Sequence, residues 1–356
     1  MTSELSSLCS YAKGKVSVDT LSKRNYVSTE NMMPNKGGIV DAGALPSAQY
    51  TQQYIKDDIL VSNIRPYFKK IWMADDDGGC SNDVLVFRAD RGCDSTFLYY
   101  ILANDAFFNY ASATSKGTKM PRGDKTAIMQ YKVPCFNYET QLRIGKLLRS
   151  IDDRIAVNKK INDNLQQQAQ AIYSSMFIDN PDPAWSHGHL SDLITVKYGK
   201  DHKKLADGIY PVYGSGGIMR YVERPLYNKE SVLIPRKGTL NNVIYVNQPF
   251  WSVDTMFYTE MKLPNVAKFV YHFVKAKDLA SMNAGSAVPS MTTDILNAME
   301  VVIPSASALE EFESLVAPMY EAMEANDVQS KALSQMRDTL LPKLMSGAID
   351  VSDVQL

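Results

Sequence analysis

The chain has 356 residues, of which 45% are hydrophobic and 22% are charged, as in an ordinary globular protein. This length is too great for one core and favours two domains with connecting elements. The 38 Lys and Arg residues nearly balance the 39 Asp and Glu residues, so the net charge of −1 gives no argument for a nucleic-acid partner.

Cysteine usage and apolar runs restrict the cellular setting. The four cysteines lie far apart and form no C-x-x-C motif, which argues against a disulfide framework or a zinc site and favours a reducing cytoplasm. The first residues lack the basic and apolar regions of an export signal. No apolar stretch approaches the roughly 20 residues that span a bilayer, so we expect a cytoplasmic protein without a membrane partner.

Short strands and helices alternate along most of the chain. Residues 84–87, 231–234 and 243–246 are β-branched or aromatic runs bounded by turn residues, which predicts buried strands. Residues 96–109 and 267–276 have helical spacing. The sequence therefore predicts an α+β fold.

The chain also contains an internal duplication. Matching phrases recur about 170–185 residues apart: 54–66 with 227–237, 81–83 with 252–254, 98–102 with 269–273, and 117–121 with 285–289. A repeat of this length indicates one duplicated module rather than a solenoid of short repeats. We therefore expect two related but different binding surfaces in one chain.

A long amphipathic segment follows each module. Four heptads with mostly apolar a and d positions predict two helices that pair as an antiparallel coiled coil. In the first helix these positions are Leu148, Ile151, Ile155, Asn158, Asn162, Leu165, Ala169, Ile172 and Met176. In the second they are Phe312, Leu315, Met319, Ala322, Asn326, Gln329, Leu333, Met336 and Leu340, with Pro342 ending the seam.

Charge is distributed unevenly between these parts. Residues 186–304 carry 13 Lys and Arg against 10 Asp and Glu, whereas the residues from 308 onward carry 3 against 9. Basic and polar loops recur at matching places in the two modules, and Arg, Lys and Asn are the residue types that contact phosphates and base edges. The predicted DNA contacts are Arg65, Lys69, Lys70, Lys116, Thr118, Lys119 and Arg122 in the first module, and Lys197, Lys200, Lys203, Lys204, Arg236, Lys237, Asn241, Asn242 and Ser286 in the second.

Catalytic motifs are weak. Residues 180–183 lack the second proline and the aromatic residue of an adenine methyltransferase loop, and no Walker motif is present. We therefore expect no catalytic residue, metal or cofactor. Two alternatives remain open: an adaptor whose modules bind proteins, and a nuclease that uses Asp254, Glu260 and Lys262.

The ordered set of these phrases resembles the specificity subunit of type I restriction–modification systems. Residues 26–38, 63–67, 209–217, 233–240 and 251–257 are similar to its recognition domains, and residues 340–347 to its helical regions. The resemblance implies a recognition domain at 1–140, a helix at 141–180, a second recognition domain at 181–307, a helix at 308–346 and a tail at 347–356. It further implies a scaffold that binds double-stranded DNA, two modification (methyltransferase) subunits and, in the full complex, restriction subunits.

This architecture predicts a bipartite, asymmetric DNA target. Helices of roughly 30 residues would form a rod of about 45 Å. Modules at its two ends would contact DNA about 13 base pairs apart. Because the loops at 115–119 and 283–287 differ, the two half-sites should also differ.

Overall fold

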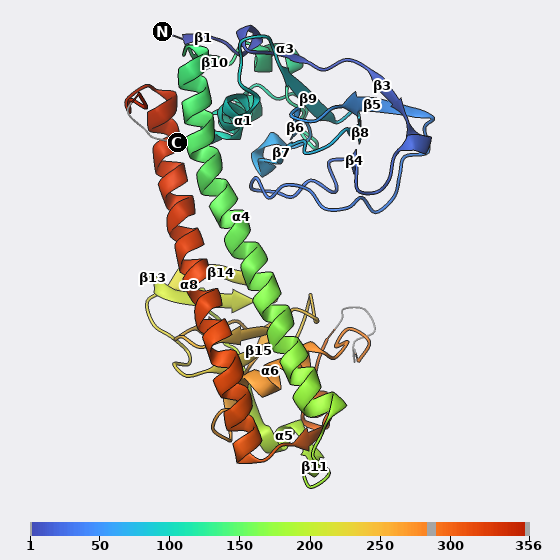
Figure 1. Ribbon diagram of the computed structural model, residues 1–356, viewed down its shortest axis with the longest axis vertical. Helices are drawn as coiled ribbons and strands as arrows, with labels where there is room; N and C mark the ends of the chain where they lie inside the picture. The colour runs from blue at the N-terminus through green and yellow to red at the C-terminus, as the bar shows by residue number, and fades with distance from the viewer. Residues whose placement is uncertain (1, 283–289, 353–356) are drawn as a thin grey trace. The chain divides into compact units, whose positions relative to one another are not determined.

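The computed structural model describes residues 2–282 and 290–352 (Figure 1). It divides into two compact units, each considered by itself: unit 1 comprises Met1–Asn158 and Asp327–Leu356, and unit 2 comprises Lys159–Asn326. Both units mix helices with short strands, which confirms the predicted α+β class.

Unit 1 contains two four-stranded sheets and one two-stranded sheet. The first sheet has the antiparallel order β2 (Cys9–Tyr11), β9 (Val84–Ala89), β6 (Ile59–Ser62), β7 (Ile71–Met73). The second has the order β3 (Lys15–Ser17), β5 (Tyr50–Tyr54), β8 (Gly78–Cys80), β4 (Tyr26–Val27), and its β4–β8 pair is parallel. The strands β1 (Thr2–Glu4) and β10 (Lys132–Pro134) pair separately.

The helices of unit 1 differ from expectation at one point. The helix predicted over 96–109 is two helices, α1 (Ser95–Ala103) and α2 (Asp105–Ala113). Asn104 separates them because its side-chain oxygen accepts a hydrogen bond from the amide of Ala106 and caps the second helix. A short helix, α3 (Lys125–Met129), is capped by Asp124 in the same way.

Unit 2 repeats the first sheet and the paired outer strands of unit 1, with a second sheet of three strands instead of four. Its first sheet has the order β12 (Ile194–Tyr198), β18 (Met256–Met261), β15 (Ser231–Pro235), β16 (Ile244–Val246). Its second has the order β14 (Gly217–Val222), β13 (Asp207–Gly214), β17 (Trp251–Ser252), and β11 (Ser186–His189) pairs with β19 (Glu300–Ile303). The helices are α5 (Leu190–Leu193), α6 (Ala267–Lys275) and α7 (Thr293–Asn297). The duplication predicted from the sequence is therefore confirmed.

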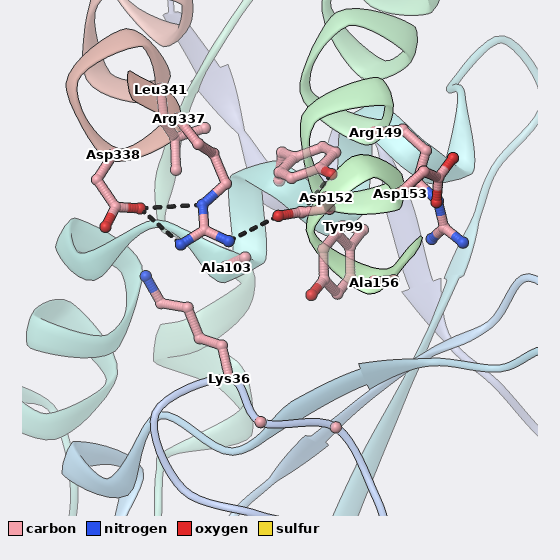
Figure 2. Close-up of a pocket in the computed structure, with 13 residues that line it drawn as sticks. Lys36, Tyr99, Ala103, Arg149, Asp152, Asp153, Ala156, Arg337, Asp338 and Leu341 are labelled. Atoms are coloured by element: carbon pink, nitrogen blue, oxygen red, sulfur yellow. Dashed lines mark hydrogen bonds and ion pairs between the residues drawn. The ribbon is translucent and has the colours of Figure 1, made fainter. Parts of the chain in front are cut away.

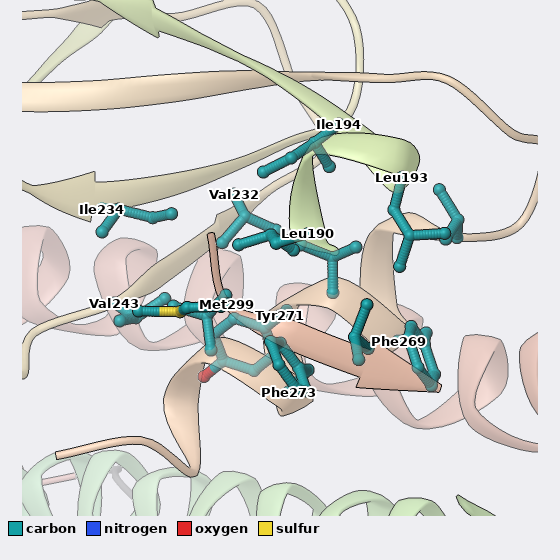
Figure 3. Packing of buried hydrophobic residues seen from close by; sticks show 14 of the residues in the cluster. Leu190, Leu193, Ile194, Val232, Ile234, Val243, Phe269, Tyr271, Phe273 and Met299 are labelled. Atoms are coloured by element: carbon teal, nitrogen blue, oxygen red, sulfur yellow. The ribbon is translucent and has the colours of Figure 1, made fainter. Parts of the chain in front are cut away.

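Each unit is held together by a core between its first sheet and its helices. In unit 2, Figure 3 shows Phe269 and Phe273 of α6 packed near Val232 of β15 and Leu190 and Leu193 of α5. The central strands are buried along their whole length, which explains their continuous apolar runs. The equivalent core of unit 1 joins β6 and β9 to α1 and to Leu148, Leu341 and Leu344 of the long helices.

The two long helices are α4 (Tyr138–Ser174) and α8 (Ala306–Met345). Within each unit, later residues of α4 contact earlier residues of α8. In unit 1 Asp152 contacts Arg337 and Asn158 contacts Gln329. In unit 2 Asn162 contacts Asn326, and the ring of Tyr173 lies 6.2 Å from that of Phe312. The predicted antiparallel pairing is therefore confirmed.

The predicted seam of α8 is partly wrong. Leu315 and Met336 are 47% and 53% exposed. Phe312 is buried as predicted, but the residues buried after it are Val316 and Tyr320, because the start of α8 packs against the core of unit 2 as well as against α4. The helix itself continues past Pro342 to Met345, close to the predicted end at 346.

In each unit a cluster of polar side chains joins the recognition module to the two long helices. In unit 1 the carboxylate of Asp152 on α4 accepts hydrogen bonds of 2.6 Å from Tyr100 of α1 and Arg337 of α8. Figure 2 shows this Arg337 guanidinium between Asp152 and Asp338, in a cleft of about 310 Å³. One carboxylate thus joins three helices.

The corresponding cluster in unit 2 uses an uncharged ring. His272 of α6 is fully buried and contacts Gln170 of α4 at 2.8 Å and Tyr320 of α8 at 2.9 Å, and its ring stacks on Tyr173. Burial lowers the pKa of His272 to about 4. The two modules are therefore attached to the same helices by different chemistry.

Candidate nucleic-acid interface

The predicted basic loop of module 1 is a closed hairpin beside the turn that follows β6. The backbones of Lys116 and Arg122 exchange hydrogen bonds of 2.8 and 2.9 Å, which close the loop around Gly117. Arg122 also bridges Ile64, and the amide of Arg65 donates to the carbonyl of Pro121 at 2.8 Å. The structure therefore brings together two of the segments predicted to bind DNA.

Module 2 joins its corresponding segments through the same backbone contacts. The carbonyl of Asn63 accepts from the amide of Gly123 in module 1, and the carbonyl of Arg236 accepts from the amide of Met291 in module 2. The bridge of Ile64 to Arg122 recurs as a bridge of Lys237 to Ser290. Predicted contact Ser286 lies outside the described residues.

Most cations of module 1 have intramolecular partners at this surface. Lys69 pairs with Asp105 at 2.9 Å, and the Lys70 ammonium donates to the carbonyl of Thr29. Lys116 pairs with Asp124 and Arg122 with Asp83, while Thr118 and Lys119 are exposed. Hydrogen bonds from Lys36 and Lys69 lower the pKa of Asp105. Exposed pairs of this kind are worth about 0–1 kcal/mol, so phosphate groups can compete for these cations.

One predicted cation of module 2 lies over an exposed tyrosine. The guanidinium of Arg236 lies 5.3 Å from the ring centroid of Tyr198 and donates to the carbonyl of Asp254 at 3.2 Å. The backbone of Lys200 is fixed by the carbonyl of Ser252 and the indole of Trp251. The side chains of Lys200, Lys203, Lys204 and Lys237 are exposed, whereas Lys197 lies on β12 beside Glu260 at 3.6 Å.

The two predicted asparagines hold their own loop. Asn241 donates to the carboxylate of Asp278 and accepts from the amide of Ala280. The Asn242 amide donates to the carbonyl of Ser215, which ties the loop to the tip of the β13–β14 hairpin. Base reading by either amide would require these hydrogen bonds to break, so their assignment as base contacts stays a prediction.

Sequence reasoning missed the aromatic side chains at this surface. Tyr67 and Phe68, which lie between Arg65 and Lys69, are 52% and 39% exposed, and Tyr198 beneath Arg236 is 52% exposed. The available signal was an aromatic pair directly after Arg-Pro in a turn, where a core residue is not expected. The polar residue Asn63, 7% exposed, was also missed.

Other chemistry has little support in the part of the chain that the structure describes. No group of three or more His, Cys, Asp or Glu side chains there could hold a metal ion, and no helix there is both long and apolar enough to cross a membrane. Two residues of the alternative nuclease site, Glu260 and Lys262, have other partners. Glu260 pairs with Lys197, and the Lys262 ammonium donates to the carbonyl of Ser191.

Comparison with known proteins gives a consistent result. The family model described as the type I restriction modification DNA specificity domain matches residues 1–167 and 184–312. The MjaIX type I restriction enzyme specificity subunit of Methanocaldococcus jannaschii is 24% identical over 74% of this chain and 71% of its own length. The HindI specificity subunit of Haemophilus influenzae is 22% identical over 91% and 94%.

A solved structure is similar in fold. The S subunit of a type I restriction–modification system from M. genitalium aligns with a TM-score of 0.63 at 19% identity, covering 97% of this chain and 96% of that chain. At this identity the likeness concerns the fold alone.

Proposed function

Because the chain belongs to the type I restriction–modification DNA specificity family, we propose that it is the DNA-reading specificity subunit of such a complex. Each module reads one half of a bipartite, asymmetric target through the turn after its central strand and the loop paired with that turn. The observation that carries the proposal is the recurrence of this paired arrangement in both modules, with the bridges Ile64–Arg122 and Lys237–Ser290. Different side chains on one repeated frame suit the reading of two different sequences.

In this proposal the chain acts as a scaffold without catalytic activity of its own. Methyl transfer and base flipping then belong to two modification subunits, and cleavage to restriction subunits. Exposed apolar residues on the long helices support a protein-binding role for that region: Val157, Ile161, Leu315, Val328 and Met336. Val157 and Ile161, four residues apart on α4, lie on one face of that helix, and neighbouring exposed apolar side chains are typical of interaction sites. The proposed division into domains at 1–140, 141–180, 181–307, 308–346 and 347–356 follows this scheme.

The decisive experiment maps the methylated motif of a cell that expresses this chain with its modification subunit. Arg236→Glu with Lys237→Glu should weaken recognition of one half-site by a few kcal/mol, because one Arg–guanine pair is worth about 1–3 kcal/mol. The matched control is Lys229→Glu with Lys275→Glu, two exposed lysines outside the proposed surface, Lys229 preceding β15 and Lys275 ending α6. If the double variant and its control methylate the same sites equally well, the turn after β15 does not contact DNA.

A further inference from the structure

The turn after β6 holds two aromatic rings outside the core. Tyr67 and Phe68 are 52% and 39% exposed, and their ring centroids are 4.8 Å apart. Adjacent Pro66 is buried, so the turn is anchored at its base while the two rings are exposed. Exposed aromatic pairs are costly to leave in water and are typical of surfaces that contact a partner.

The backbone that carries these rings is fixed in an unfavourable conformation. Arg65 and Lys69, on either side of Pro66–Phe68, both have a φ of 52°, in the left-handed region that residues other than glycine rarely adopt. Hydrogen bonds of 2.8 Å hold the turn from both sides, from the Arg65 amide to Pro121 and from the Asn35 and Lys36 amides to the carbonyls of Phe68 and Lys69. The backbone that carries the two rings is therefore held in place.

Module 2 forms the same turn without the rings. Its turn after β15 has a matching hydrogen bond, from Asn242 to Thr239 where module 1 has Lys69 to Pro66. In this register Gly238, with a φ of 86°, stands where module 1 has Arg65. The position of Tyr67 is taken by Leu240, which is 2% exposed. The fold itself thus accepts glycine and a buried leucine at these places.

The surroundings of the rings indicate the kind of partner. The Lys70 ammonium lies 5.9 Å from the Phe68 centroid, and Arg122 is bridged to the same turn through Ile64. The Nε of Arg65 is buried and, among the described residues, has no hydrogen-bond partner. Apolar rings among cations match a polyanion that also offers flat apolar faces, which are the bases of DNA.

We propose that Tyr67 and Phe68 form an aromatic wedge that unstacks one base step in the half-site read by module 1. The inference rests on the DNA-reading function proposed above. Aromatic side chains stack on base faces with little sequence preference, so the wedge contributes affinity and a requirement for a deformable step rather than base identity. Module 2, whose corresponding residue is the buried Leu240, reads its half-site without such a wedge on this turn.

The test uses the full chain together with its modification subunit and duplexes that carry the mapped methylated motif. A single 2-aminopurine replaces one base at a time through both half-sites, because its fluorescence rises when it loses stacking. Base flipping by the two modification subunits should raise the fluorescence at the methylated base of each half-site. Beyond these two signals, the wild type should produce one additional rise, at one step of the half-site read by module 1. Tyr67→Ala with Phe68→Ala should abolish that rise and weaken motif binding about tenfold, whereas Tyr67→Phe with Phe68→Tyr should retain both.

A matched control and the possible failures separate this inference from the proposed function. Tyr50→Ala removes an equally exposed ring, 54%, at the start of β5, and should leave both readouts unchanged. If the wild type does not prefer the motif over random duplex, the DNA-reading function itself fails. If it does, but the double alanine variant binds and unstacks like the wild type, the wedge is refuted. The wedge is likewise refuted if that variant loses only the modification subunit, since the rings would then bind protein.

Discussion

Lowering the pH should destabilise unit 2 through His272. This ring is fully buried between Gln170 and Tyr320, and its pKa of about 4 lies below the value of 6.5 expected in the unfolded chain. Between these pH values His272 is protonated in the unfolded state but not in the folded state, so the free energy of unfolding falls as the pH drops from 6.5 to 4. At about 1.36 kcal/mol per pKa unit, the total loss is about 3 kcal/mol.

The assay compares the wild type with His272→Gln by urea unfolding at steps between pH 7.5 and 4. Intrinsic fluorescence reports on this unit because Trp185 and Trp251 belong to it. Glutamine can keep hydrogen bonds to both helices but does not titrate in this range. The side chains that contact His272 are uncharged, so carboxylate titrations elsewhere should cancel between the two proteins. Equal pH slopes for the two proteins would refute the reasoning.

Three further outcomes are expected. Leu148→Ala should lower the free energy of unfolding by about 2–5 kcal/mol in denaturant titrations, because Leu148 is fully buried, whereas Val157→Ala, 46% exposed on the same helix, should change it by less than about 1 kcal/mol. Lys200→Ala should weaken binding to all duplexes about equally. It should also reduce the slope of the logarithm of the binding constant against the logarithm of the salt concentration by about one. A loss of affinity confined to the motif would contradict the assignment of Lys200 as a phosphate contact. Arg65→Gly should raise the melting temperature through about 0.5–1 kcal/mol of relieved backbone strain while weakening motif binding, and unchanged binding would show that the arginine is not retained for DNA.

The duplication and the paired helices could be predicted from the sequence because their signals are local. Heptad spacing reports directly on one face of a helix, and repeated phrases report on repeated elements. The errors arose where two partners compete for one element. The heptad prediction for α8 considered contact with α4 only. Phe312, Val316 and Tyr320 also pack against the core of unit 2, and Leu315 is therefore exposed.

The candidate interface was predicted less completely than the fold. Residue type and recurrence located the two loops, but they could not show which side chains the fold already uses. The amides of Asn241 and Asn242 are committed to Asp278 and Ser215, and Lys69 is committed to Asp105, through contacts between segments distant in the sequence. The exposed rings of Tyr67 and Phe68 were missed because aromatic residues are more often buried, and only tertiary structure shows that this turn faces outward.

The central claim is that two modules of one chain read two separate half-sites. Residues 186–304 should be exchanged for the equivalent region of a related specificity subunit, and the methylated motif mapped with the modification subunit present. The account predicts a bipartite, non-palindromic motif in which the exchange alters one half and leaves the other unchanged. A continuous or palindromic motif, or an exchange that alters both halves, would contradict it.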